Sequence, residues 1–399
     1  AFVVVVGLVL GAAGMMVLDD AVRESPARAD RTQRVEPAPD ASIAASEQVL
    51  LVWTPNGLPV DLAATVAALP NVTVTSEVQG DLVEMVASTA SDGAAVDTTA
   101  AGYVIPLDAL AVDPATYARF VPKGAAAVFG ALKPGEVILG ETSARLRRVD
   151  VGGTIVLASG EQLRVAAVLG DALVGGAEIV VPRGTLGAIT TPRFLLVTTR
   201  GARSDFEAAV RAQLPATVAV RFRAPGEAPL LRHGDAVLAQ AVVKEQFGEF
   251  AYRHAGGRDL DLDPTWVRDH IVAVDLPLLG QVRCHRAIVG DLRATLLELE
   301  RANLGYVVTP EGVAGCFVPR LISPDGGLSR HAWGIAIDLN WPKNLQGELG
   351  TQDVRLVEAL VAHGFAWGGR WLVPDPAHFE WVGGKQSSSD PQGEGQRRR

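Results

Sequence analysis

A histidine and an aspartate in the segment SRHAWGIAID have types and spacing that suit metal binding. His331 and Asp338 are seven residues apart, and the alternation of small and apolar residues around Ile335–Leu339 predicts a buried strand. This strand presents Asp338 on the same side as Ala336, and a loop before it carries His331. One imidazole and one carboxylate that converge in this way suit a borderline cation such as Zn²⁺.

A second acidic residue and a second histidine follow in the segment WLVPDPAHFEWVG. Asp375 and His378 are three residues apart, but Pro374 and Pro376 argue against a helix, so we expect a stiff loop that leads into a strand from Phe379. His378 then supplies a third protein ligand. Three protein ligands leave the fourth position of a tetrahedral zinc ion open to water, which is typical of a catalytic site.

Both segments resemble the signatures of peptidase family M15, the D-alanyl-D-alanine carboxypeptidases and dipeptidases related to VanY and VanX. That family has the pattern S-x-H-x-x-G-x-A-x-D, followed by an acidic residue three positions before a second histidine. The first pattern is matched at its five fixed positions, Ser329, His331, Gly334, Ala336 and Asp338. The second is matched by Asp375 and His378, and the resemblance extends over residues 283–383.

The resemblance implies a role for each matched residue. It makes three residues the zinc ligands, namely His331, Asp338 and His378. It makes Asp375 the general base, and Arg320 and Ser329 residues that bind the substrate. Glu380 would orient a ligand histidine, although it also fits a solvated strand residue. One departure concerns Asp375, because VanY-like members usually carry Glu there, whereas branches that include phage endolysin endopeptidases carry Asp.

These roles imply hydrolysis of a peptide bond by an activated water. Zinc brings the pKa of a bound water toward about 7, Asp375 takes its proton, and Arg320 pairs with a substrate carboxylate. We therefore expect a zinc metallopeptidase that acts on peptidoglycan stem peptides, with D-alanyl-D-alanine carboxypeptidase as the favoured activity. Two alternatives are an endopeptidase of the same family and a non-catalytic peptide-binding or regulatory module of a cell-envelope complex.

The two cysteines, Cys284 and Cys316, are expected to form a disulfide if the chain is exported. The alternative is a pair of buried, reduced thiols. A cysteine nucleophile at Cys284 with His285 as its base is disfavoured, because adjacent residues point their side chains apart. The histidines outside the two motifs have no ligand-like partner nearby in the sequence.

The N-terminal segment from Phe2 to Leu18 carries no charged residue. Its length is near the lower limit of a membrane-spanning helix, which needs about 20 apolar residues. We expect an uncleaved single-pass anchor in the cell membrane, with the folded domains extracytoplasmic. A cleaved signal peptide and a buried core helix are the alternatives.

The middle of the chain alternates short β-type runs with two helical stretches, Ser143–Val149 and Ser204–Leu214, which predicts an α+β domain with a largely antiparallel sheet. Within it, Gly135–Val168 weakly resembles the extracytoplasmic domain of MacB/FtsX-type transporter permeases. The resemblance implies a scaffold, or an interaction module for a cell-envelope protein, and a spacer with no partner is the alternative. Two further helices are expected. The first covers Arg286–Asn303, with Ile288, Leu292, Leu296 and Leu299 on one face. The second covers Gln352–His363, with Thr351 as its N-cap.

The whole chain is therefore expected to be α+β, with a C-terminal zinc peptidase domain built on a central antiparallel sheet and flanking helices. Its 399 residues, 48% hydrophobic and 20% charged, suffice for two folded domains. The net charge of -9 argues against nucleic acid as a partner, because phosphate binding needs a basic face. We expect five segments: a transmembrane anchor (1–18), a linker (19–46), an α+β extracytoplasmic scaffold or interaction domain (47–228), a zinc peptidase domain (240–384) and a disordered tail (385–399).

Overall fold

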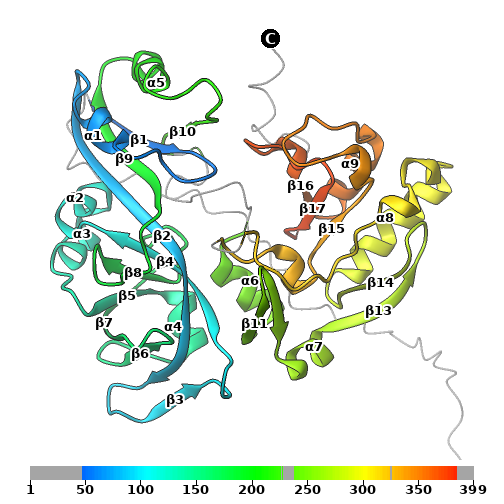
Figure 1. Ribbon diagram of the computed structural model, residues 1–399, viewed down its shortest axis with the longest axis horizontal. Coiled ribbons are helices and arrows are strands. Elements are labelled where there is room, and N and C mark those ends of the chain that lie inside the picture. The colour runs from blue at the N-terminus through cyan, green and yellow to red at the C-terminus, as the bar shows by residue number, and fades with distance from the viewer. Residues whose placement is uncertain (1–46, 226, 228–237, 324–325, 384–399) are drawn as a thin grey trace, which may run out of the picture. The chain divides into compact units, whose positions relative to one another are not determined.

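The computed structural model describes residues 47–225, 227, 238–323 and 326–383 (Figure 1). All of them belong to one compact unit, residues 33–399. The expected anchor, linker and tail lie outside the described residues. Within the described part, every helix is too short or too polar to cross a membrane. We call residues 47–225 the N-terminal region and residues 238–383 the C-terminal region.

The N-terminal region is built on one ten-stranded sheet in the order β10-β1-β9-β2-β4-β8-β5-β7-β6, with β3 paired to β2. The strands are β1 (Glu47–Trp53), β2 (Val72–Thr89), β3 (Ala95–Thr98), β4 (Ile105–Val112), β5 (Glu136–Gly140), β6 (Thr154–Leu157), β7 (Gln162–Leu169), β8 (Ile179–Pro182), β9 (Pro192–Arg200) and β10 (Arg221–Arg223). Its helices are α1 (Leu62–Ala67), α2 (Pro114–Tyr117), α3 (Lys123–Gly130), α4 (Glu141–Arg147) and α5 (Arg203–Arg211).

Strand β2 organises this sheet, and Figure 1 shows it as a long, bent strand. It pairs with β9 near its start, with β4 along its middle and with β6 near its end. The strand order β2-β4-β8-β5-β7-β6 ends on a strand that pairs with β2 again, so these six strands form a closed ring. The ring surrounds an apolar core that includes Met85, Leu107 and Val165. The pairs β4–β8 and β5–β7 are parallel and the others are antiparallel, so the expectation of a largely antiparallel sheet is confirmed.

The C-terminal region contains two hairpins and a small three-stranded sheet in the order β15-β17-β16. Its strands are β11 (Tyr252–Gly256), β12 (Asp259–Leu262), β13 (Ile271–Leu276), β14 (Gly280–His285), β15 (Ala336–Asp338), β16 (Phe365–Trp367) and β17 (His378–Trp381). Its helices are α6 (Gln240–Phe247), α7 (Pro264–His270), α8 (Val289–Arg301) and α9 (Val354–Ala362), and short 3-10 turns include η5 (Arg330–Trp333) and η7 (Gly368–Arg370).

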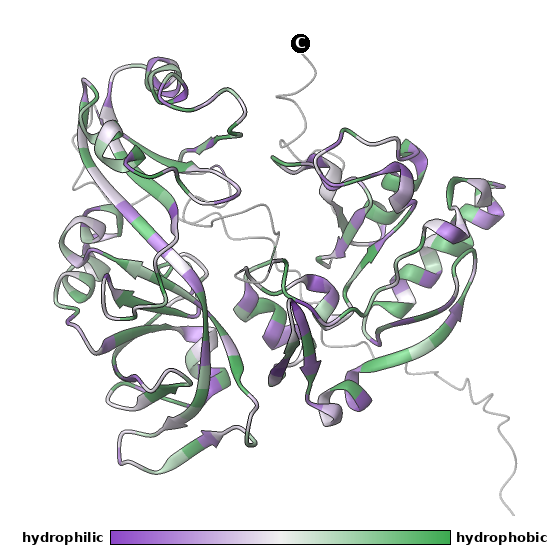
Figure 2. Cartoon of the chain, viewed as in Figure 1, coloured by the Kyte–Doolittle hydropathy of each residue, from purple (hydrophilic) through white to green (hydrophobic). Residues whose placement is uncertain are grey.

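Helix α9 packs against β16 of this small sheet, and α8 packs against α9. Both helices carry hydrophobic and hydrophilic residues, green and purple in Figure 2. Leu292, Leu296 and Leu299 of α8 are buried in one core with Leu356 and Leu360 of α9. This is the face that helical spacing predicts for α8. The C-terminal region is thus mixed α+β, and its small sheet carries Asp338 on β15 and His378 on β17.

The helix boundaries differ from the predicted ones where capping was misread. Helix α9 begins after Asp353, whose carboxylate accepts a hydrogen bond from the Arg355 amide at 2.9 Å, and not at Thr351. Helix α5 begins at Arg203 after Ala202, without a side-chain cap, one residue before the predicted start at Ser204. Several neighbouring residues can each serve as an N-cap, and the sequence does not show which of them the backbone places at the start of the helix.

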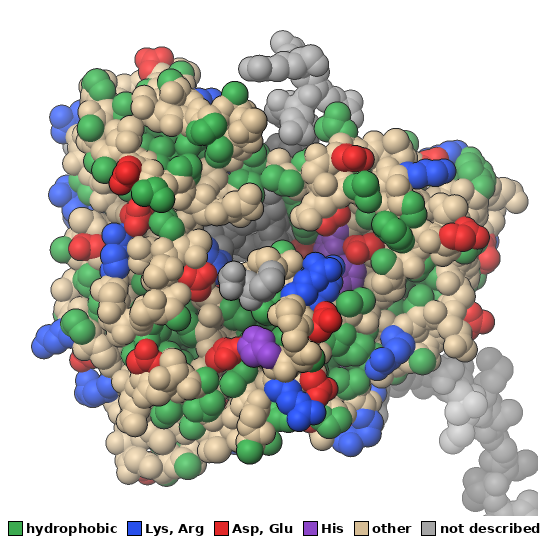
Figure 3. Space-filling view, in the orientation of Figure 1, with side chains coloured by type: hydrophobic (Ala, Val, Ile, Leu, Met, Phe, Trp, Pro, Cys, Tyr) green, Lys and Arg blue, Asp and Glu red, His purple; other side chains and the backbone are tan. Residues whose placement is uncertain are grey.

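Positive and negative side chains are interspersed over the face shown in Figure 3. The described residues on that face therefore form no extended surface of one charge.

Candidate metal centre

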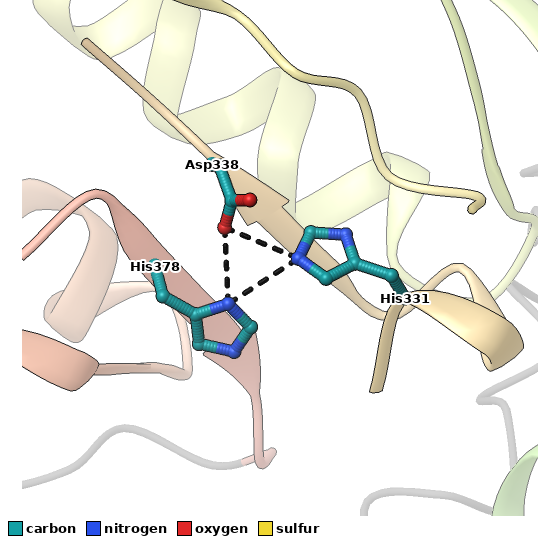
Figure 4. A group of neighbouring side chains, drawn as sticks. All are labelled: His331, Asp338 and His378. Atoms are coloured by element: carbon teal, nitrogen blue, oxygen red, sulfur yellow. Dashed lines mark hydrogen bonds and ion pairs between the residues drawn. The ribbon is translucent and has the colours of Figure 1, made fainter. Parts of the chain in front are cut away.

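The three predicted ligands come together from three adjacent elements (Figure 4). His331 lies in the η5 turn, Asp338 ends β15 and His378 begins β17. The antiparallel register of β15 and β17 places Asp338 directly opposite His378, so that their side chains share one face of the sheet. Two segments 40 residues apart thereby contribute to one site, as the motif spacing predicts.

The spacing of the three ligand atoms fits a small tetrahedral cation. Asp338 Oδ1 lies 3.1 Å from His331 Nε2 and 3.0 Å from His378 Nδ1, and the two nitrogens are 3.3 Å apart. Atoms that bind zinc tetrahedrally at about 2.0–2.1 Å lie about 3.3 Å from one another. The observed separations are therefore close to those that zinc would impose.

The tautomer of His331 follows from its second ring nitrogen. Its Nδ1 lies 3.2 Å from the backbone carbonyl oxygen of Cys316, and a carbonyl can only accept. Nδ1 therefore carries the hydrogen, and Nε2 presents a lone pair to Asp338 and His378. A disulfide between Cys284 and Cys316 anchors the segment that bears this carbonyl. The Val318 amide, which donates to the His331 carbonyl at 3.0 Å, holds the same segment against η5.

The buried carboxylate of Glu380 lies close to His378 and biases the tautomer of this ring. Because alternate residues of a strand face the same side, Glu380 lies beside His378, with Oε2 3.7 Å from Nε2. Glu380 is buried, so its interpretation as a solvated strand residue is wrong. The carboxylate favours a hydrogen on Nε2, so the Nδ1 lone pair would be available to a metal ion bound beside Asp338. The Trp371 ring packs against the imidazole, with centroids 5.1 Å apart.

With both histidines in these tautomers, three lone-pair atoms would converge on one point, which is repulsive unless a positive charge, either a proton on His378 Nδ1 or a metal ion, lies among them. Burial lowers the pKa of His378, but hydrogen bonding to Asp338 and Glu380 outweighs it and raises the pKa to about 10. Burial raises the pKa of Asp338, but the two histidines outweigh it and hold the pKa far below its usual range. The site therefore stabilises a positive charge, and its two nitrogens and one oxygen match the donor set of catalytic zinc sites.

Asp375 sits on the loop that precedes β17, at the edge of the three ligands. Its amide donates to the Gly368 carbonyl at 2.9 Å, and its own carbonyl accepts from the His378 amide at 3.0 Å. Gly368 allows this close approach, because a Cβ there would lie 2.6 Å from the Asp375 carbonyl oxygen. Burial raises the pKa of Asp375, and the Asp338 charge adds to this effect against the opposing histidines. A carboxylate with a raised pKa is a better proton acceptor.

Arg320 is half-buried and faces the same site. The Ser329 amide donates to its carbonyl at 3.2 Å, which ties it to the chain just before η5. Burial and the nearby Arg258 lower the pKa of the guanidinium, whereas the charges of Asp338 and Asp375 raise it. The Arg320 side chain is therefore in the electrostatic range of the ligand Asp338 and of the predicted base Asp375.

Two motif residues have structural duties that explain their types. Ser329 is buried, and its hydroxyl accepts from the His331 amide at 3.3 Å, which caps η5. Its binding of substrate remains a prediction. Gly334 ends the turn with φ +69°, and a Cβ there would lie 2.9 Å from the His285 amide nitrogen. Only glycine accepts both conditions easily.

His285 is structural, as expected. Its Nε2 donates to the Phe247 carbonyl at 3.1 Å, and burial lowers its pKa to about 4. Its neighbour Cys284 is in the disulfide and is not a nucleophile.

Residues 323–381 match the family model of D-alanyl-D-alanine carboxypeptidase. The match spans the three candidate ligands, Asp375 and Glu380, whereas Arg320 lies just before it. It supports a peptidase of family M15, whose members are zinc-dependent, as the class of this segment. No curated protein sequence matches the chain.

Two solved structures are similar to part of the chain. The periplasmic region of MacB from Actinobacillus actinomycetemcomitans is 12% identical, with a TM-score of 0.30 over 45% of this chain and 89% of that one. The extracellular domain of the noncanonic ABC-type transporter YknZ from Gram-positive bacteria is 11% identical, with a TM-score of 0.26 over 41% of this chain and 88% of that one. Both likenesses are weak.

Sequence reasoning missed two contributors to the site, the Cys316 carbonyl and Gly368. A backbone carbonyl has no sequence signature, so the orienting role of Cys316 could not be found. Gly368 stands in a Gly-Gly pair, a turn signal that does not reveal which chain approaches it.

Proposed function

We propose that this chain is a zinc-dependent peptidase that acts on peptidoglycan stem peptides, with D-alanyl-D-alanine carboxypeptidase as its activity. The observation that carries the proposal is the convergence of His331 Nε2, Asp338 Oδ1 and His378 Nδ1 at separations of 3.0–3.3 Å. The family match over residues 323–381 supports the peptidase class.

The protein residues would divide the work of hydrolysis. When bound, zinc supplies Lewis acidity, which brings the pKa of a water toward about 7 and polarises a carbonyl. Asp375 would accept the proton of the attacking water and return one to the leaving amine. Arg320 would hold the substrate through a bidentate pair with its terminal carboxylate. The Cys316 carbonyl and Glu380 would keep the two imidazoles in the ligating tautomers.

We further propose that the folded part is extracytoplasmic and anchored in the cell membrane. The apolar segment over residues 1–18 supports an anchor or an export signal. The disulfide supports an oxidising compartment, because such bonds are rare in reducing ones. The N-terminal region contributes none of the three ligands, and we propose that it serves as a scaffold or as an interaction module for another envelope protein.

The test of zinc dependence uses the purified full chain and the His331→Ala variant. The wild type should bind close to one zinc ion per chain and release D-alanine from a muropeptide that ends in D-Ala-D-Ala. The variant should lose both properties and keep its circular dichroism spectrum. Hydrolysis at the wild-type rate by a zinc-free variant would contradict the proposal.

An endopeptidase of the same chemistry is the second candidate, because Asp375 occupies the position where VanY-like members usually carry Glu. This activity would cut within the stem or the cross-link instead of at its C-terminus. The masses of the products distinguish the two. Tight binding of the peptide without turnover would favour a receptor module over either enzyme.

A further inference from the structure

A cluster of four buried charges joins the two regions of the chain. The N-terminal region contributes Arg147, the last residue of α4, and Glu178, which directly precedes β8. The C-terminal region contributes Lys244 of α6 and Glu249, which lies two residues after α6. Arg147 Nη2 lies 3.0 Å from Glu178, and Lys244 Nζ lies 2.8 Å from Glu178 and 2.9 Å from Glu249. Arg147 also pairs with Glu249. Three of the side chains are fully buried, and Glu249 is 14% exposed.

The cluster contains two positive and two negative side chains, and uncharged groups around it form further hydrogen bonds to Glu178 and Lys244. Glu178 also accepts from Gln240 Nε2 at 2.7 Å and from the Asp108 amide at 3.0 Å, and Lys244 donates to the Pro106 carbonyl. Buried charges are costly unless each finds its partners. Any displacement of α6 from the large sheet would leave charges unpaired, so this network fixes the position of α6 against the N-terminal region.

The same helix is bonded at both ends to the turn that carries His331. Before α6, the Leu238 carbonyl accepts from Arg330 Nη2 at 2.5 Å. After α6, the Gly248 carbonyl accepts from Trp333 Nε1 at 3.2 Å. Arg330 and Trp333 are the first and last residues of η5. The turn that presents His331 is thus held between the two ends of α6.

Aromatic contacts extend the connection to β17. The Phe247 ring meets the Trp381 ring edge-on, with centroids 5.4 Å apart, and Trp381 ends the strand that begins at His378. Phe250 packs against Trp333, with centroids 4.8 Å apart. Both ligand histidines therefore lie on elements that contact α6 or the residues directly after it.

We propose that the N-terminal region positions the metal centre through α6, and that Glu249 is the positioning residue in this connection. The buried cluster holds α6 and the residues after it, which in turn hold η5 and β17 at the separation that brings His331 to His378. The N-terminal region is then a structural part of the site, beyond its proposed scaffold role. The inference rests on the proposed function only for the identity of the bound metal.

The test compares two glutamates of one segment in the full chain. Glu249→Gln removes a charge from the buried cluster, whereas Glu245→Gln removes one from the exposed pair with Arg145, whose atoms are 2.7 Å apart. In the metal-free protein, the amides of residues 329–338 and 377–382 should exchange with deuterium at least tenfold faster in Glu249→Gln, while those of α8 keep the wild-type rate. Zinc should bind about tenfold more weakly. Glu245→Gln should behave as wild type in both measurements.

Wild-type exchange and zinc affinity in folded Glu249→Gln would overturn the inference. Faster exchange spread evenly over α8 as well would also overturn it, because that indicates general destabilisation. If Glu249→Gln does not fold, the test uses Arg147→Lys, which keeps every charge but loses the forked geometry of the guanidinium. Its deuterium exchange and zinc affinity are then compared with those of the wild type in the same way. If the wild-type protein hydrolyses no peptide, the proposed function is wrong. The exchange comparison in the metal-free protein needs no hydrolysis and still tests this inference.

Discussion

The imidazole of His331 donates its Nδ1 hydrogen to the backbone carbonyl of Cys316, at 3.2 Å. This contact couples a disulfide to a candidate metal ligand. It orients the ring so that Nε2 meets Asp338. Because Cys316 supplies both the carbonyl and one sulfur of the bridge, the disulfide is joined directly to the residue that orients His331.

Removal of the bridge should therefore affect both stability and metal binding. A Cys284→Ser, Cys316→Ser double variant opens a crosslink between residues 32 apart in sequence. The loop-closure model gives a loss of about 3–4 kcal/mol in the free energy of unfolding. Urea unfolding measures this loss, and zinc titration of the folded variant should show weaker binding. Unchanged zinc affinity would mean that the bridge does not support the His331 orientation.

Substitution of the predicted base should separate chemistry from metal binding. Asp375→Asn keeps the shape of the side chain but cannot accept the proton, so kcat should fall by about 10²–10⁴-fold. Zinc stoichiometry should stay at the wild-type value, since the three ligands are untouched. Asp353→Asn, at the exposed start of α9, is the matched control and should keep full activity. A kcat within a factor of about three of wild type in Asp375→Asn would reject this base.

Arg320 should matter only for substrates that end in a free carboxylate. Arg320→Ala should lower kcat/KM by roughly 10–100-fold, mainly through KM, because a charge-assisted pair contributes about 1.5–3 kcal/mol. Kinetics with the same peptide carrying a C-terminal amide provide the comparison. The wild type and the variant should then cleave at similar rates. An equal loss on both peptides would assign Arg320 a structural role.

The buried cluster predicts a particular pH dependence of stability. Burial alone would raise the pKa of Glu249, but Lys244 and Arg147 outweigh it and lower the pKa from 4.5 to about 2. The Glu249 carboxylate therefore stabilises the fold above about pH 4.5, and this contribution is lost as the pH falls toward 2. The shift corresponds to a loss on the order of 3 kcal/mol.

Urea unfolding between pH 6 and pH 3 measures this dependence, with Glu249→Gln as the reference. The facing charges from the neighbouring elements are Arg147, Lys244 and Glu178, and all are retained in the variant. The difference in unfolding free energy between wild type and variant should shrink as the pH falls. A constant difference would show that Glu249 does not titrate in this range.

The sequence was most informative where a few residues act close together along the chain. The spacing of His331 and Asp338, and of Asp375 and His378, predicted the site because each pair lies within one short segment of the chain. The α8 face was predicted because helical periodicity is itself local. These features need no knowledge of the rest of the fold.

Long-range features could not be predicted in the same way. The link between Glu249 and Arg147 joins residues 102 apart, and either residue alone fits a solvated surface charge. The closure of β2 onto β6 likewise depends on strand order, which composition does not encode. The cap at Asp353 was missed because Thr351 offered an equally good local signal.

The most direct test of the central claim is the mass of the product released from a muropeptide that ends in D-Ala-D-Ala. The full chain is incubated with this substrate with zinc, with a chelator, and with zinc restored after chelation. We predict loss of one alanine residue with zinc, no reaction with the chelator, and recovery when zinc is restored. An unaltered muropeptide in the presence of zinc, or cleavage that persists in the chelator, would contradict this prediction.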